Sequence, residues 1–189
     1  MTVPTMQDTE GNKMCYPSFR YVHGRVEKAL RRFYQKNLHL LQEEVHERSM
    51  TAKLSECLQP FFKDWNVDCE YNRNTSEPNH IKSIPGHRPV YPDIIIHRRG
   101  TDNNLLVIEA KPPHTSARKI EMDKKKIRKY VSYDKLKYRY GLFIEFKDNF
   151  ECTCADLQWY RRGRDKKLQW YDNDGVMIPL ENRTAKQDE

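Results

Sequence analysis

Two short apolar segments rich in β-branched residues each carry a carboxylate, and no other feature constrains this chain as much. Residues 90–97 enclose Asp93 among valine and isoleucine, and residues 105–108 lead directly into Glu109 and Lys111. Both segments are typical of buried strands. An unpaired buried charge is costly or shifts its pKa until it is neutral, so carboxylates in such places usually pair with a cation or bind a metal ion. The sequence therefore predicts a functional site where these two strands meet.

The length and charge of the chain limit what this site can belong to. At 189 residues the chain is long enough for one domain with a proper core and short for two. Charged residues make up 32% of it, but the apolar residues cluster in periodic blocks, which is typical of a folded domain. The formal net charge of +7 favours a polyanionic partner such as nucleic acid without deciding it.

The ends of the chain and its cysteines indicate how the domain is bounded and where it works. We expect a loose N-terminal arm over residues 1–23, one domain over residues 24–181 and a disordered tail over residues 182–189. The sequence has neither an N-terminal signal nor an apolar run that could cross a bilayer, so we expect a cytoplasmic protein without a membrane partner. Five cysteines without CxxC spacing predict reduced thiols and not a disulfide framework or a zinc site: Cys15, Cys57, Cys69, Cys152 and Cys154.

Hydrophobic periodicity predicts a mixed α/β domain. Helical spacing runs through residues 25–62, either as one long helix or as two helices separated near Asn37, and a basic amphipathic helix is expected over residues 117–133. The expected strands cover residues 66–71, 90–97, 105–111 and 138–146.

The segments between these elements add three expectations. Residues 98–104 suit a hairpin turn, which would make the strands of Asp93 and Glu109 antiparallel neighbours. Residues 72–89 form a long loop of a kind that often contacts substrate. Leu157–Tyr160 recurs as Leu168–Tyr171, which predicts a final β-hairpin; an aromatic platform for stacking bases is the alternative.

Asp93, Glu109 and Lys111 can converge on one side of the expected hairpin. Side chains alternate along a strand, so Glu109 and Lys111 share a face, and a suitable register brings Asp93 to it. Two carboxylates and the carbonyl of Ala110 would give a hard cation such as Mg²⁺ oxygen ligands on one hemisphere. Lys111 could then hold or deprotonate an attacking water, or stabilise charge on a phosphate, which suits phosphodiester hydrolysis. The alternative for Lys111 is a surface salt bridge.

The tripeptide of an acid, any residue and lysine is not specific by itself. It occurs four times, and the copies that begin at Asp123 and Asp165 lie in charged segments that are expected to be exposed to solvent. Glu145 begins the serious competitor, because it also ends an apolar strand. No preceding hairpin strand brings Glu145 a second carboxylate, which favours Glu109.

Together these residues resemble the PD-(D/E)xK nuclease superfamily, which has the restriction-endonuclease-like fold. Pro92 and Asp93 match its first motif, and Glu109 and Lys111 match its second. The expected order of elements over residues 44–146 is similar to the αβββαβ core of that superfamily. The resemblance implies a mixed central sheet flanked by helices, with the C-terminal hairpin as an addition, and a Mg²⁺-dependent activity in which Mn²⁺ can substitute.

The resemblance also implies an acidic residue on the first helix of the core, close to the metal. Residues 46–49 look like that position in uncharacterised bacterial members, and Glu47 is the acid there. Steps of four, seven and eleven from Glu47 reach the stripe expected to pack on the sheet, formed by Thr51, Leu54 and Leu58. Glu43 lies one turn earlier and remains an alternative. Either acid could instead pair with Arg48 or a neighbouring lysine.

Basic residues near the motif are candidates for contacts with nucleic-acid phosphates. Lysines and arginines crowd residues 117–133, although a solvated helix face explains them equally well. The resemblance implies that one basic or polar residue of this helix faces the site, and Lys126 is the candidate. Arg73 and Lys82 are further candidates. Strand alternation could bring His97 near Asp93, but an ordinary hydrogen-bonded histidine is the preferred interpretation.

We therefore expect a Mg²⁺-dependent nuclease that acts on nucleic acid, with DNA favoured over RNA. The expected metal ligands and catalytic residues are Asp93, Glu109, Ala110, Glu47 and Lys111. One alternative is a catalytically inactive binding module of the same fold, and another is a scaffold with no nucleic-acid role. The sequence is compatible with a monomer and with a homodimer.

Overall fold

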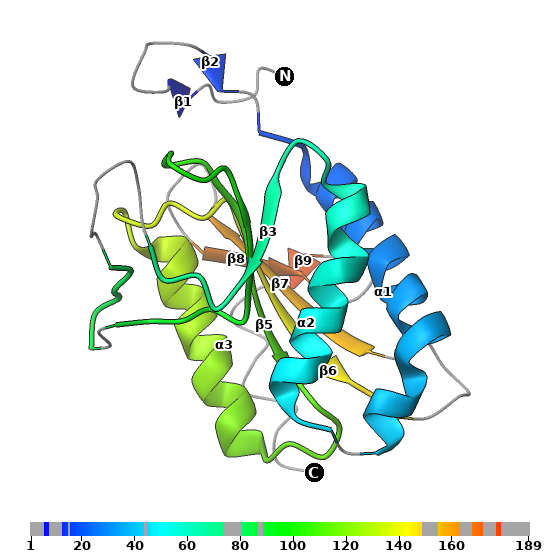
Figure 1. The fold of residues 1–189 in the computed structure, drawn as a ribbon. Helices are drawn as coiled ribbons and strands as arrows, with labels where there is room; N and C mark the ends of the chain where they lie inside the picture. The colour runs from blue at the N-terminus through cyan, green and yellow to red at the C-terminus, as the bar shows by residue number, and fades with distance from the viewer. Residues whose placement is uncertain are drawn as a thin grey trace.

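The protein has a mixed α/β fold in which helices cover both faces of one mixed sheet (Figure 1). The computed structural model describes residues 6–7, 13–14, 16–43, 45–73, 81–86, 89–148, 155–162, 168–171 and 177–178. The predicted α/β class is confirmed. Near the N-terminus, β1 (Met6–Gln7) and β2 (Lys13–Met14) pair in a separate two-stranded sheet.

The main sheet contains seven strands in the order in which they follow one another along the chain. Strands β5 and β6 run parallel, and the other neighbouring pairs are antiparallel. The predicted hairpin between the strands of Asp93 and Glu109 is therefore confirmed. The strands are β3 (Asn66–Cys69), β4 (Ile94–His97), β5 (Asn104–Lys111), β6 (Tyr140–Phe146), β7 (Ala155–Arg162), β8 (Leu168–Tyr171) and β9 (Met177–Ile178).

Two helices, α1 (Phe19–Gln42) and α2 (Glu47–Leu58), cover one face of the sheet, and the short 3₁₀ turn η1 (Gln59–Phe61) follows them (Figure 1). Helix α1 begins before residue 24, where the sequence predicted the start of the domain, because Ser18 caps it by accepting a hydrogen bond from the N–H of Tyr21 at 3.3 Å. The predicted break near Asn37 is a kink within α1. Helix α1 ends at Gln42 and helix α2 begins at Glu47, a separation that periodicity did not reveal.

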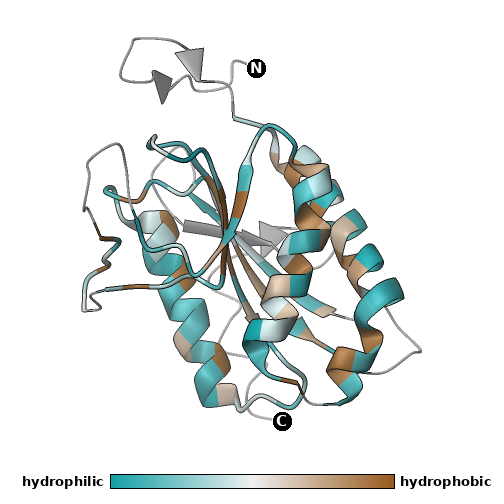
Figure 2. Ribbon diagram, viewed as in Figure 1, coloured by the Kyte–Doolittle hydropathy of each residue, from teal (hydrophilic) through white to brown (hydrophobic). Residues whose placement is uncertain are grey.

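Apolar side chains fill both faces of the central strands. On the α1–α2 face, Ile94 and Ile96 belong to the same buried cluster as Leu54 of α2. On the other face, Ile95 and Val107 belong to a cluster completed by the third helix. Strands β4 and β5 are thus buried on both sides, which explains why their sequences are continuously apolar. Figure 2 shows hydrophobic residues gathered on these strands and hydrophilic residues on the outer helix surfaces.

Helix α3 (Ala117–Ser132) lies on the face opposite α1 and α2 (Figure 1). Gly141 of β6 is the point of closest approach between this helix and the sheet. A Cβ atom at Gly141 would come within 2.8 Å of a methyl group of Val131 and closer still to one of Ile127. Glycine at this position therefore lets α3 pack directly on β6, which places the helix beside the end of β5.

The C-terminal strands include the predicted hairpin of β7 and β8, with Tyr160 opposite Trp170. Trp159 and Tyr160 are 0% and 2% exposed, so these aromatic rings belong to the core, and an exposed stacking platform on β7 is excluded. No helix in the described part of the chain is long and apolar enough to cross a membrane. Cys57 and Cys69 are free thiols. The predicted tail over residues 182–189 and the other cysteines, Cys15, Cys152 and Cys154, lie outside the described residues.

Candidate active site

The hairpin of β4 and β5 brings the two predicted carboxylates together. Its register pairs Ile94 with Ile108, and one further step along the ladder places Asp93 opposite Glu109. Residues directly opposite each other in an antiparallel pair project to the same face of the sheet. The backbone N–H of Ala110 donates to Asp93 Oδ2 at 2.8 Å, which ties Asp93 to β5. Both acids therefore lie on the face that α3 covers.

Glu109 is almost completely enclosed, with 1% of its surface exposed. Its Oε1 atom has no hydrogen-bond partner in the described structure, and its Oε2 atom lies 3.8 Å from Lys126 Nζ. Burial and the negative charge of Asp93 raise the pKa of Glu109 well above its usual value. Burial also raises the pKa of Asp93 to about 6, although the hydrogen bond from Ala110 opposes this. A cation between these two carboxylates would favour their ionised forms.

Lys111 lies between two carboxylates that come from different helices. Its Nζ atom is 2.7 Å from Glu47 Oε1 on α2 and 2.9 Å from Asp123 Oδ2 on α3. Its side chain is 10% exposed, so this is not the surface salt bridge considered as the alternative. Burial alone would lower the pKa of Lys111, but the hydrogen bonds to Glu47 and Asp123 outweigh it and raise the pKa. Lys111 is therefore held as an ammonium ion.

Asp123 is the site residue that the sequence reasoning missed. Its charged surroundings predicted exposure to solvent, but it is 4% exposed, and this expectation is wrong. Besides Lys111, it binds Lys126, whose Nζ atom is 2.5 Å from Asp123 Oδ1. Helical spacing could have predicted the burial of Asp123, because this residue lies on the same stripe as Ile127 and Tyr130, which are both buried. The positive charge of Lys111 and Lys126 explains why a carboxylate is tolerated on that stripe.

Glu47 is brought to the site because it is the first residue of α2, where the helix dipole favours a negative charge. The residues expected to form the buried stripe behind it are indeed buried, namely Thr51, Leu54 and Leu58. Glu43 caps the end of α1, and the chain leaves the helix before α2 starts, so the two acids do not share a stripe. The spacing argument that made Glu43 an alternative to Glu47 therefore does not apply. Arg48 pairs with Glu70 at 2.7 Å and not with Glu47.

We call the resulting group of charged side chains the acid–lysine cluster. It comprises Glu47, Asp93, Glu109, Lys111, Asp123 and Lys126. Four carboxylates thus face two ammonium groups, which leaves an excess of negative formal charge at the end of β5.

The donor atoms of this cluster fit a hard divalent cation. Carboxylate and carbonyl oxygens are the ligands that Mg²⁺ takes from proteins, and the partnerless Oε1 atom of Glu109 is such an oxygen. Within the described residues, no group of three or more His, Cys, Asp or Glu side chains is arranged to hold a metal ion. The ligand set expected from the sequence contains three acidic side chains, Asp93, Glu109 and Glu47, besides the carbonyl of Ala110. In the structure Glu47 Oε1 lies 2.7 Å from Lys111 Nζ.

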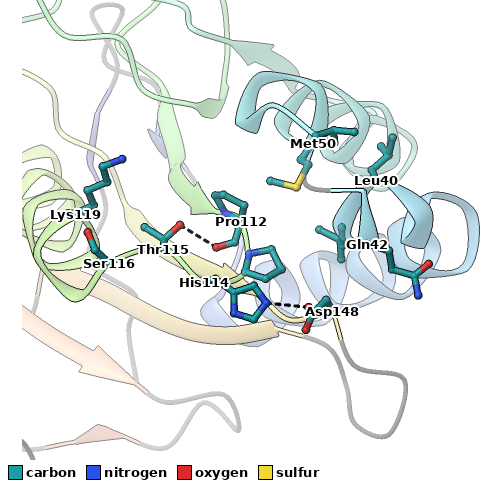
Figure 3. Close-up of a pocket in the computed structure, with 12 residues that line it drawn as sticks. Leu40, Gln42, Met50, Pro112, His114, Thr115, Ser116, Lys119 and Asp148 are labelled. Atoms are coloured by element: carbon teal, nitrogen blue, oxygen red, sulfur yellow. Dashed lines mark hydrogen bonds and ion pairs between the residues drawn. The ribbon is translucent and has the colours of Figure 1, made fainter.

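A pocket of about 580 Å³ opens beside the acid–lysine cluster (Figure 3). Its walls come from the end of α1, from α2, from the segment after β5 and from the start of α3. Figure 3 shows Met50 and Leu40 on one side, Lys119 on the other, and Pro112 between them. Pro112 directly follows Lys111, so the pocket and the cluster share the end of β5.

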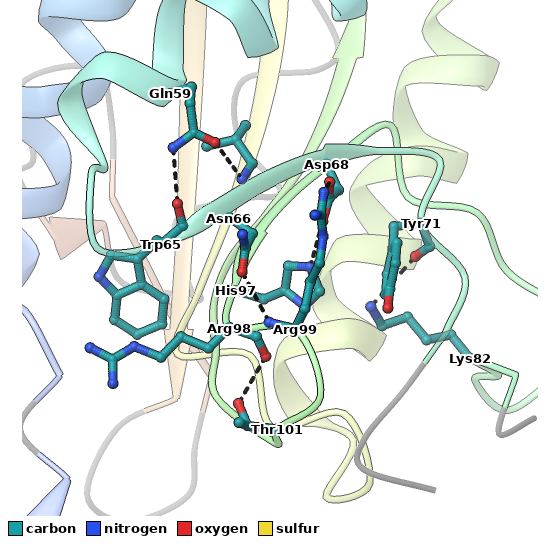
Figure 4. A network of polar contacts seen from close by, with 11 residues as sticks. Gln59, Trp65, Asn66, Asp68, Tyr71, Lys82, His97, Arg98, Arg99 and Thr101 are labelled. Carbon is teal, nitrogen blue, oxygen red and sulfur yellow. Dashed lines mark hydrogen bonds and ion pairs between the residues drawn. The ribbon is translucent and has the colours of Figure 1, made fainter. Parts of the chain in front are cut away.

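The basic residues expected to contact phosphate lie in different environments. Lys126 belongs to the cluster. Lys82 is 1% exposed, and its Nζ atom lies 5.0 Å from the ring centre of Tyr71 (Figure 4). The same atom lies 5.7 Å from the ring centre of Tyr138. Burial lowers the pKa of Lys82 to about 7. The structure therefore does not bring Lys82 to a surface where a phosphate could reach it. Arg73 is exposed, in a backbone bridge after β3.

His97 lies at the far end of β4 from Asp93 and takes no part in the cluster. Its Nε2 atom is 2.8 Å from Asp68 Oδ2, and Arg99 Nε donates to the same oxygen at 2.8 Å (Figure 4). His97 is 3% exposed. It is thus an ordinary hydrogen-bonded histidine of the core, which was the preferred interpretation.

Glu145, the competing acid of the sequence analysis, pairs with an exposed lysine. Its Oε1 atom lies 3.1 Å from Lys147 Nζ, and Lys147 also contacts Asp156 at 3.0 Å. The chain matches no protein-family model and no curated protein, so a functional proposal depends on the geometry and chemistry of the acid–lysine cluster.

Proposed function

We propose that the protein is a Mg²⁺-dependent nuclease of the restriction-endonuclease-like type, with the acid–lysine cluster as its active centre. The observation that carries this proposal is the pair of half-buried Asp93 and buried Glu109 beside Lys111, in which Glu109 Oε1 has no hydrogen-bond partner in the described structure. The position of these residues on one hairpin is what the resemblance to the PD-(D/E)xK superfamily leads us to expect.

The order of the elements supports the same proposal. Helix α2 is followed by β3, β4 and β5, then by α3 and β6, with β5 antiparallel to β4 and parallel to β6. This succession is similar to the αβββαβ core of the superfamily. In this arrangement α2 supplies Glu47, the hairpin supplies Asp93, Glu109 and Lys111, and α3 supplies Lys126.

Each residue of the centre has a proposed role. Asp93, Glu109 and the Ala110 carbonyl hold the divalent ion, with Glu47 as a further acid in reach of it. When bound, Mg²⁺ supplies Lewis-acid stabilisation of the phosphate and lowers the pKa of water, and Mn²⁺ can replace it. Lys111 is kept charged by two carboxylates, so it stabilises negative charge or orients the attacking water and does not remove a proton.

The proposed substrate is nucleic acid, with DNA favoured. The net charge of +7 favours a polyanion, and two exposed basic residues lie at the start of α3 close to the cluster, namely Arg118 and Lys119. Contacts of such residues with phosphates are largely independent of base sequence.

A cleavage assay tests the proposal. Purified protein with Mg²⁺ is incubated with single-stranded, double-stranded and branched DNA and with RNA. We expect cleavage of at least one substrate, and we expect EDTA and the substitution Asp93→Asn to abolish it. Asp102→Asn, in the exposed turn between β4 and β5, is the matched control and should cleave like the wild type. The absence of cleavage with both Mg²⁺ and Mn²⁺, or full activity of Asp93→Asn, would overturn the proposal.

The second candidate function is nucleic-acid binding without catalysis. The observation that favours it is the pairing of Lys111 with both Glu47 and Asp123, which keeps this ammonium occupied. Binding that survives the loss of Asp93 and Glu109, with no turnover on any substrate of the panel, would support the inactive module.

A further inference from the structure

We propose that the pocket beside the acid–lysine cluster binds one nucleotide of the substrate strand, with its base against the apolar wall and its phosphate towards Lys119. This inference rests on the proposed nuclease function, because it assigns a substrate-binding subsite to the same centre. The expected ligand is therefore flat and apolar at one end and anionic at the other.

The pocket lining and the cluster are linked along the chain at α2, at α3 and at the end of β5. Helix α2 carries Met50 in the pocket wall one turn after Glu47 in the cluster. Helix α3 carries Lys119 in the pocket wall one turn before Asp123 in the cluster. One helical turn is ~5.4 Å long, so a nucleotide in the pocket lies beside the end of β5. A phosphodiester that links this nucleotide to its neighbour would therefore lie close to the cluster.

The two sides of the pocket differ in chemistry, as Figure 3 shows. Leu40, Met50 and Pro112 give an apolar side, against which a base or sugar can pack. Lys119 and Ser116 give a polar side at the start of α3. Ligand pockets usually have volumes of roughly 300–1,000 Å³ and combine apolar walls with a few polar groups. The volume of about 580 Å³ is thus enough for one nucleotide.

Charge fixes the orientation of the nucleotide. Lys119 is exposed at the first turn of α3, where the helix dipole also favours an anion. The opposite rim carries Asp148, whose Oδ2 atom lies 3.0 Å from His114 Nε2. A phosphate on that rim would meet a carboxylate. The favourable arrangement therefore has the phosphate at α3 and the base against Met50.

Binding of deoxyadenosine 5′-monophosphate to the full chain, measured by calorimetry without divalent ions, tests the pocket. Gln42→Trp places a large side chain at the exposed end of α1 in the pocket wall, and Gln35→Trp makes the same change on an exposed part of α1 outside it. Lys119→Glu reverses a charge in the wall, and Lys125→Glu does so one helix face away. We expect Gln42→Trp and Lys119→Glu to weaken binding at least ~10-fold, or ~1.4 kcal/mol, and the two controls to bind like the wild type.

Several results would overturn the inference. They are the absence of nucleotide binding, equal weakening by Lys119→Glu and Lys125→Glu, and full affinity in Gln42→Trp. Equal affinity for deoxyadenosine, which lacks the phosphate, would also overturn it. Failure of the proposed function is distinguishable: Asp93-dependent cleavage without nucleotide binding refutes the pocket alone, and nucleotide binding with the expected variant pattern but without cleavage refutes the nuclease alone.

Discussion

At the scale of single residues, the raised pKa of Asp93 couples the protonation of this residue to the stability of the fold. The pKa of Asp93 is raised to about 6 by burial, whereas an aspartate in an unfolded chain titrates near ~3.9. The folded protein thus holds this proton more tightly than the unfolded chain does. Its stabilising contribution is complete below ~pH 4 and is lost as the pH rises through ~6.

This difference predicts a pH-dependent effect of Asp93→Asn. The asparagine side chain keeps the shape and can still accept the hydrogen bond from Ala110, but it cannot ionise. In EDTA at neutral pH, the variant should therefore have a higher Tm than the wild type, and the difference should shrink as the pH falls towards ~4. Thermal unfolding over this pH range measures it, with Asp102→Asn as the control. A difference that does not change with pH would show that Asp93 is not an uncompensated buried acid.

Individual residues could be predicted where their local context was unusual. Asp93, Glu109 and Lys111 stand out because apolar strands surround them. The burial of Lys82 was not predicted, because it depends on Tyr71, which precedes the long loop, and on Tyr138, which is distant in the chain. Contacts of this kind arise from tertiary packing and leave no local pattern.

At the scale of elements, α3 contributes a carboxylate that holds two lysines in place. Asp123→Ala would leave Lys111 and Lys126 without this partner in a largely buried setting. Removal of one partner from buried ion pairs typically costs ~3–5 kcal/mol, and the partial exposure of Lys126 should reduce this to about 2–4 kcal/mol. Urea unfolding measures the loss of stability.

The same helix offers a matched control for Asp123→Ala. Glu121 is 33% exposed and lies 3.8 Å from both Lys124 and Arg128. Ion pairs of this partly exposed kind contribute little to folding stability, so Glu121→Ala should change the free energy of unfolding by at most ~1 kcal/mol. Equal effects of the two substitutions would show that the ion pairs of Asp123 stabilise the fold no more than those of Glu121 do.

Element types were easier to predict than element ends. The turn chemistry of residues 98–104 and the apolar runs beside it predicted the β4–β5 hairpin, since both signals are local. The end of α1 at Gln42 and the start of α2 at Glu47 were not predicted, because apolar periodicity continues between them. The expectation that Glu43 lies on the same helical stripe as Glu47 was wrong for the same reason.

At the scale of the whole molecule, the cluster joins all three layers. Lys111 at the end of the central sheet contacts Glu47 of the α2 layer and Asp123 of the α3 layer. The chain brings these acids together only when both helices have packed on the sheet. The pairing of Lys111 with Asp123 could therefore not be predicted from either segment alone.

The net charge of +7 predicts salt-dependent binding to nucleic acid. Contacts between lysine or arginine and phosphates release counterions, so the logarithm of the affinity should fall linearly with the logarithm of the salt concentration. Fluorescence anisotropy of labelled DNA with Asp93→Asn, which should not cleave it, measures this slope. An affinity that is unchanged between low and moderate salt would favour the scaffold that has no nucleic-acid role.

The proposed nuclease function depends on Asp93 and Glu109 forming one divalent-cation site. Calorimetric titration with Mn²⁺ tests this without knowledge of the substrate. The wild type should bind the ion, Glu109→Gln should weaken binding at least ~10-fold, or ~1.4 kcal/mol, and Glu121→Gln should bind like the wild type. Equal binding by the wild type and Glu109→Gln, or no binding by either, would contradict a cation site between these two acids.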